Sequence, residues 1–128
     1  MHSYDYAIVR VLPRVERGEQ VNAGVILSCA AAGYLRARFE LDEALLCCMA
    51  PGLDLEPIRA ALAGIDAVCA GGAAAGSLGQ LSTRERFHWL VAPRSTSVQV
   101  SPVHTGRCAD LDAALEDLMQ KLVRRPPG

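Results

Sequence analysis

Apolar and polar positions follow a two-residue period in the first third of the chain, which is typical of β-strands. The period is cleanest in residues 34–41, where each apolar side chain is followed by a polar or charged one. Pro13 cannot donate a hydrogen bond to a sheet, so the first strand should end there. The pattern predicts three strands, over residues 4–12, 21–29 and 34–41, and the AAAG turn between the last two makes them an antiparallel hairpin.

The rest of the chain changes mostly to a period of three to four residues, which is typical of helices with one buried face. Such runs begin after Asp42, Asp54 and Ser82 and at Asp110, and these four residues are suited to cap a helix start. Glu85 follows Ser82 by three residues, which fits a capping box. The pattern predicts four helices, over residues 42–49, 55–70, 82–90 and 109–125, a loop over 71–80 and a fourth strand over 96–103.

This order of elements predicts an α+β fold, with an antiparallel sheet of about four strands and helices packed on one face. The chain has 128 residues, and a domain usually has roughly 100–200, so we expect a single globular domain over residues 1–128. The edge of the first hairpin needs a cover. A symmetric homodimer would provide one.

Composition narrows the class of protein. The chain is 51% apolar and 21% charged, which excludes a disordered chain. A net charge of -1 and 5% aromatic residues make nucleic acid an unlikely partner, although a local basic face stays open. No apolar run approaches the roughly 18–20 residues of a membrane span. Five scattered cysteines are typical of a reduced, cytoplasmic protein, so we expect that location and no membrane partner.

The sequence shows neither a phosphate-binding glycine loop nor a zinc-type cysteine spacing, so we expect no cofactor and no metal. His104 and Cys108 stand four residues apart, just before the last predicted helix. A helix start can lower the pKa of a thiol, and a nearby histidine can act as its base. A half-buried cysteine in a turn is the favoured interpretation of Cys108.

Donors suited to an anion gather in two clusters. The first lies around the loop between the first two strands and contains Arg10, Arg14, Arg17, Glu19 and Asn22. The second flanks the fourth strand and contains Arg86, Arg94, Ser95, Thr96 and His104. Guanidinium and hydroxyl groups beside a tight turn can hold a carboxylate or a phosphate. The apolar residues next to Arg86 are expected to be core anchors: Phe87, Trp89 and Leu90.

Four blocks of the sequence stand out together: RxxPxxxRGExxNxG from Arg10 to Gly24, RFxWL from Arg86 to Leu90, PRST from Pro93 to Thr96, and HTG from His104 to Gly106. In these blocks the chain resembles the bacterial family known as domain of unknown function 3037, from Tyr4 through the last helix. The resemblance implies a small bacterial protein whose two polar clusters belong together. It implies no particular reaction.

The leading hypothesis is a binding or accessory protein without catalysis, which presents the two clusters to an anionic small molecule or to a protein partner. Arg17 and Arg94 would contact the anion, Glu19 would orient an arginine, and His104 would lie at the rim. The alternative is a small hydrolase or transferase that acts on a phosphorylated substrate with His104 as general acid/base. A nucleic-acid-binding module is the third hypothesis.

Overall fold

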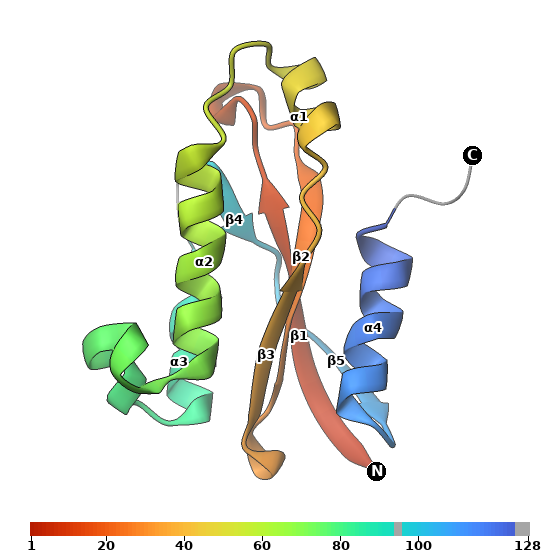
Figure 1. The fold of residues 1–128 in the computed structure, drawn as a ribbon. Coiled ribbons are helices and arrows are strands. Elements are labelled where there is room, and N and C mark those ends of the chain that lie inside the picture. Colours follow the sequence, from red (N-terminus) through yellow and green to blue (C-terminus); the bar gives the residue numbers. More distant parts are fainter. Residues whose placement is uncertain (94–95, 125–128) are drawn as a thin grey trace.

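The computed structural model describes residues 1–93 and 96–124, and its elements are labelled in Figure 1. The strands are β1 (His2–Val11), β2 (Val21–Cys29), β3 (Tyr34–Phe39), β4 (Val98–Val100) and β5 (His104–Cys108). The α-helices are α1 (Glu43–Met49), α2 (Glu56–Ala70), α3 (Thr83–Leu90) and α4 (Leu111–Leu122). Short 3₁₀ segments occupy connections: η1 (Val15–Arg17), η2 (Ala30–Ala32) and η3 (Gly72–Gln80).

Within the described residues, five strands form one antiparallel sheet in the order β3-β2-β1-β4, and β5 pairs with β1 as well. The short strands β4 and β5 pair with the same side of the long strand β1: β5 pairs with residues 2–6 and β4 with residues 9–11. The α+β class and the antiparallel hairpin of β2 and β3 are confirmed.

The edge beside β1 consists of two short strands, where the sequence predicts one strand over residues 96–103 and a turn after it. Ser101 lies between β4 and β5 and is 3% exposed. Its hydroxyl accepts a hydrogen bond from the backbone N–H of Ile8 at 2.8 Å, and its own N–H donates to the Ile8 carbonyl at 2.8 Å. Pro102 follows and cannot donate. Pairing resumes only at His104, which adds a fifth strand to the predicted sheet.

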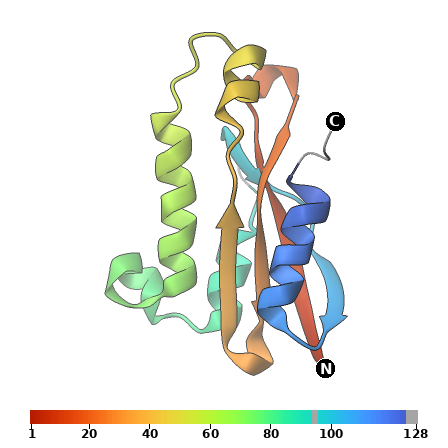
Figure 2. The same cartoon turned by 45° about the vertical axis from the view of Figure 1, so that its right-hand side comes forward.

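Helices cover both faces of the sheet, as Figures 1 and 2 show. Helices α2 and α3 pack on one face against residues such as Val9 and Ile26, whereas α4 packs on the other against Val25 and Leu27. The sequence predicts helices on one face, and the position of α4 corrects that arrangement. The reason lies in β2: its consecutive apolar residues 25–27 point to alternate faces, so both faces need a cover.

The predicted helix starts are confirmed where a cap is specified locally. The Asp42 carboxylate accepts from the N–H of Leu45 at 3.0 Å, at the start of α1. Ser82 and Glu85 form the complete capping box at the start of α3. Asp110 accepts from the N–H of Ala113 at 3.1 Å, at the start of α4.

Candidate functional site

The loop after β1 carries the first predicted cluster at one end of the molecule, beside α1 (Figure 1). Arg17 donates a hydrogen bond to Glu19, and both side chains are exposed. This bond and the charge of Glu19 raise the pKa of Arg17 above its ordinary value. The carboxylate also offsets the positive charge that an anionic ligand would need at this position.

Asn22 lies on β2 and fixes α4. Its side-chain amide donates a hydrogen bond to the Leu122 carbonyl at 2.9 Å. Leu122 ends the helix, and carbonyls in the last turn of a helix have no partner within it. Asn22 therefore holds the carboxyl end of α4 on the sheet.

Arg86 closes the carboxyl end of α2. Its Nη1 donates to the carbonyls of Val68 and Cys69, both at 2.7 Å, and its Nε donates to the Leu81 carbonyl at 3.3 Å. A cation at this end also suits the helix dipole. The guanidinium that the sequence assigns to ligand binding has its donors directed at the backbone.

Thr96 begins the described chain after the gap, since Arg94 and Ser95 lie outside the described residues. The Thr96 hydroxyl donates to the Val98 carbonyl at 2.6 Å. The Thr96 carbonyl in turn accepts from the Gln99 side chain at 3.0 Å. These bonds fix the chain as it enters β4.

His104 lies on β5 opposite Tyr6, and the two ring centroids are 5.4 Å apart. Cys108 is half-buried, as the favoured interpretation expects, but it ends the strand β5 and does not lie in a turn. The alternative, in which His104 serves Cys108 as base, does not fit this extended strand. Four residues of strand span about 13 Å, which is too far for a direct hydrogen bond between the two side chains.

Two described members of the second cluster, His104 and Arg86, lie away from the loop that carries Arg17. Thr96 is closer to this loop, because the N–H of Leu12 donates to the carbonyl of the adjacent Ser97 at 2.7 Å. His104 pairs with Tyr6, and the Arg17 loop begins only after Val11. Tyr6 and Val11 are five residues apart on β1, which corresponds to about 17 Å along the strand. Arg86 lies at the end of α2, on the face that α4 does not cover. His104 and Arg86 therefore do not share a site with Arg17.

A different feature offers room for a ligand: an apolar hollow of about 640 Å³ between α2, η3, α3 and β4. Pockets for small molecules usually measure roughly 300–1,000 Å³. Thr96 and Ser97 are the hydroxyl-bearing residues on its described wall. Most of the wall is apolar and includes Ile58, Ile65, Val68, Trp89, Leu90 and Val98.

Trp89 belongs to this apolar hollow and not to the core. Phe87 and Leu90 are 4% and 1% exposed, as predicted for core anchors, but Trp89 is 40% exposed, so that prediction was wrong. On α2, the wall of the hollow contains Ala61 and Gly64, and these small residues leave space for it. Their spacing of three residues was the signal in the sequence that pointed to an open helix face.

The chemistry of the described residues is otherwise sparse. Among residues 1–93 and 96–124, no group of three His, Cys, Asp or Glu side chains is placed to hold a metal ion. Burial, together with the Asp66 carboxylate, raises the pKa of Cys69 to about 12, and Arg86 opposes this shift. Cys69 therefore stays a protonated thiol at neutral pH.

No single helix in the described part of the chain is long and apolar enough to cross a membrane. Helix α2 and the segment η3 together have the length and the apolar composition of a span, but the chain bends by 73° between them.

Residues 6–123 match the model of a family described as Protein of unknown function (DUF3037). The chain belongs to the DUF3037 family. The resemblance seen in the four sequence blocks is therefore confirmed over nearly the whole chain. No curated protein and no solved structure matches the chain significantly.

Several residues of the four sequence blocks have structural roles in the fold of this DUF3037 protein. A Cβ atom on Gly24 would collide with the Phe39 ring on β3, and one on Gly106 would collide with the Tyr4 ring on β1. Arg86 caps α2. The PRST block leads into Thr96 and so into the apolar hollow, which makes it the block with the clearest relation to a ligand site.

Proposed function

We propose that this DUF3037 protein is a bacterial, cytoplasmic binding protein for an amphipathic anion. The apolar body of the ligand would occupy the apolar hollow, and its carboxylate or phosphate would lie at the part of the wall that contains Thr96 and Ser97. The observation that supports this proposal is the position of Thr96 and Ser97 on the wall of an otherwise apolar hollow.

The size of the hollow suits a molecule with a short alkyl or ring system. Burial of a methylene contributes about 0.8 kcal/mol, so eight methylenes contribute roughly 6 kcal/mol. Association and ordering cost several kcal/mol in return. Apolar contacts alone would therefore give weak binding, and the polar group of the ligand has to supply the rest.

Arg94 is the residue that we assign to this polar group. It precedes Thr96 by two residues. Guanidinium groups bind carboxylates and phosphates through two parallel hydrogen bonds. A hydrogen bond to a charged group contributes about 1.5–3 kcal/mol, which corresponds to roughly a tenfold to hundredfold gain in affinity.

A catalytic role for His104 gains no support from its surroundings. Its ring is exposed and packs on Tyr6. Within the described residues, no carboxylate or hydroxyl is hydrogen-bonded to it. A general base needs a group that orients it and a substrate within reach. Binding without catalysis is therefore the function that we propose.

The fluorescence of Trp89 provides a direct test, because it is the single tryptophan of the chain and lies on the wall of the hollow. We expect decanoate to change this fluorescence saturably and decanol to bind about tenfold more weakly, since it lacks the charge. Arg94→Ala should reduce decanoate affinity to that of decanol. Arg107→Ala, which removes an exposed arginine on β5, should leave it unchanged.

A second pair of variants tests the hollow itself, by calorimetry. Gly64 lies on its wall and an added Cβ would meet no atom within 4 Å, so Gly64→Leu should fill the space and abolish decanoate binding. Ala63→Leu, at an exposed neighbouring position, is the matched control and should bind normally. Unchanged decanoate affinity in both Arg94→Ala and Gly64→Leu would overturn the proposal.

A further inference from the structure

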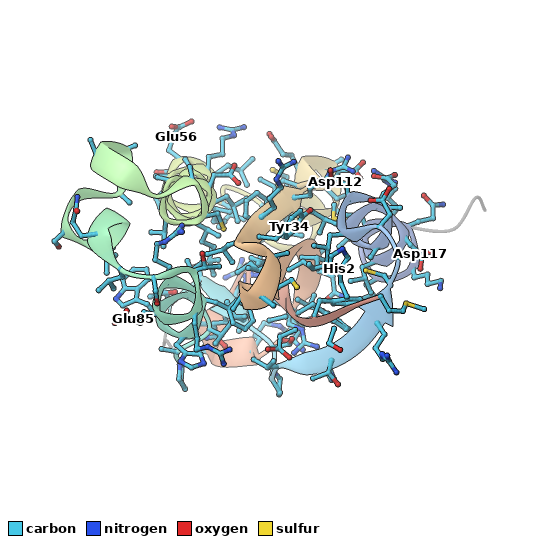
Figure 3. All side chains as sticks on the ribbon, turned by 90° about the horizontal axis from the view of Figure 1, so that it is seen from below. His2, Tyr34, Glu56, Glu85, Asp112 and Asp117 are labelled. Carbon is cyan, nitrogen blue, oxygen red and sulfur yellow. The ribbon has the colours of Figure 1, made fainter. Side chains whose placement is uncertain are left out.

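A second hollow, smaller and polar, lies where β1 begins and β2 ends. It measures about 150 Å³ and is separate from the apolar hollow. Figure 3 looks at this end of the molecule and shows α3, which carries the labelled Glu85, beside the ends of the strands. Polar side chains from three elements line this polar hollow: Ser3 and Asp5 from β1, Ser28 from β2, and Arg84 and His88 from α3.

The topology explains why these five side chains converge. Asp5 and Ser28 are direct partners in the β1–β2 ladder, so they point to the same face of the sheet. Ser3 stands two residues before Asp5 and shares that face. Arg84 and His88 are four residues apart on α3, which places them on one side of the helix.

The groups around the polar hollow lack partners of their own. Ser28 is 5% exposed as a residue, and its hydroxyl, which forms no hydrogen bond with a described residue, stays accessible from the hollow. Asp5 and Arg84 border the same hollow without forming an ion pair with each other or with another described residue. A molecule in the hollow can therefore contact all three groups without breaking a hydrogen bond or an ion pair between described residues.

We propose that the polar hollow binds a small zwitterion, an α-amino acid with a short side chain. Its ammonium group would lie on the Asp5 carboxylate and its carboxylate on the Arg84 guanidinium. The Ser28 hydroxyl would complete the contacts at the floor, and Ser3 and His88 would contribute at the sides.

The charges and the size select this class of ligand. A simple anion would be repelled by Asp5, and a simple cation by Arg84, so a molecule with both charges fits best. A cavity of about 150 Å³ holds a molecule of benzene size, about six non-hydrogen atoms. Alanine and serine are of that size. Phe87, a buried residue of α3, also lines the hollow.

The test is a titration of the intact chain with L-alanine, followed by the backbone amide signals in ¹H–¹⁵N NMR spectra. We expect saturable shifts around Asp5, Ser28 and Arg84, with a dissociation constant of about a millimolar or below. Propionate and ethylamine, which each keep one of the two charges, should bind at least about tenfold more weakly. Phenylalanine should be excluded by its size.

Charge-neutral variants identify the contacts. Asp5→Asn and Arg84→Gln should each weaken L-alanine binding by about tenfold or more. The matched controls Asp117→Asn and Arg59→Gln remove the same charges from surface ion pairs on α4 and α2, and should bind like the unaltered protein. Ser28→Ala should weaken binding several-fold.

Three outcomes would overturn this proposal: no saturable shift up to about 50 mM L-alanine, L-alanine binding by both charge-neutral variants as tight as that of the unaltered protein, or propionate or inorganic phosphate binding as tightly as L-alanine. Arg84 lies on an exposed part of α3, so Arg84→Gln should stay folded even if Asp5→Asn does not. Decanoate binding in the apolar hollow is measured separately, so either proposal can fail alone.

Discussion

Arg84 and Arg86 lie two residues apart on α3 and serve different parts of the molecule, because positions two apart on a helix are separated by about 200°. Arg86 turns toward α2 and donates to its last carbonyls. Arg84 borders the polar hollow. Arg17, in the loop after β1, is paired with Glu19. The same type of side chain therefore has a structural role, a ligand-facing position and a surface ion pair within one small protein.

We predict that Arg86→Met lowers the free energy of unfolding by about 2–4 kcal/mol. Methionine keeps an apolar stem but leaves the carbonyls of Val68 and Cys69 without their donor. Arg84→Met is the matched control on the same helix and should change stability by less than about 0.5 kcal/mol. Urea unfolding of both variants measures the difference, and an equal loss in the two would contradict the capping role of Arg86.

This residue also shows why the candidate site was hard to predict. Arg86 was placed in a binding cluster because donors near a turn look alike in a sequence. Its partners Val68 and Cys69 precede it by 18 and 17 residues, on another helix. Only packing brings them together. The lining of the apolar hollow was missed for the same reason, since its walls come from α2, α3 and β4 and no local pattern joins them.

At the scale of elements, Gly24 on β2 is packed closely against β3. An added Cβ would overlap the Phe39 ring and the Arg38 carbonyl. Gly24→Ala should therefore destabilise the protein by about 2–4 kcal/mol, because the backbone of β3 has to move. Gly64→Ala, in the middle of α2 with no atom within 4 Å of the new Cβ, should stabilise it by about 0.5–1 kcal/mol. Thermal unfolding distinguishes the two, and a stabilised Gly24→Ala variant would contradict the close approach.

Elements that are specified locally were predictable, whereas those set by pairing were not. The starts of α1, α3 and α4 followed from Asp42, Ser82 and Asp110, because a cap and its helix are neighbours in sequence. The strand β5 was missed, since HTGRC has little strand character and is held by its pairing with β1. The face covered by α4 depends on which side of β2 lacks a cover, and that is decided only when the sheet forms.

At the scale of the whole molecule, one sheet is shared by two apolar clusters. Val25 and Leu27 face α4, and Ile26 between them faces α2 and α3. Loss of either helical layer would expose one face of the same strands. Loss of α4 from one face of β2 would also disturb the packing of α2 and α3 on its other face. We therefore expect the two helical layers to unfold together.

Met119 and Trp89 allow this cooperativity to be measured from opposite sides of the sheet. Met119 lies on α4, is 0% exposed and belongs to the cluster that contains Val25 and Leu27. Met119→Ala should cost about 2–4 kcal/mol and should lower the urea midpoint reported by Trp89 fluorescence on α3, with circular dichroism giving the same midpoint. Lys121→Ala removes an exposed ion pair on α4 and should leave the Trp89 midpoint nearly unchanged. If Met119→Ala lowered only the midpoint seen by circular dichroism, α4 would unfold as a separate unit. The proposal of one cooperative domain would then be wrong.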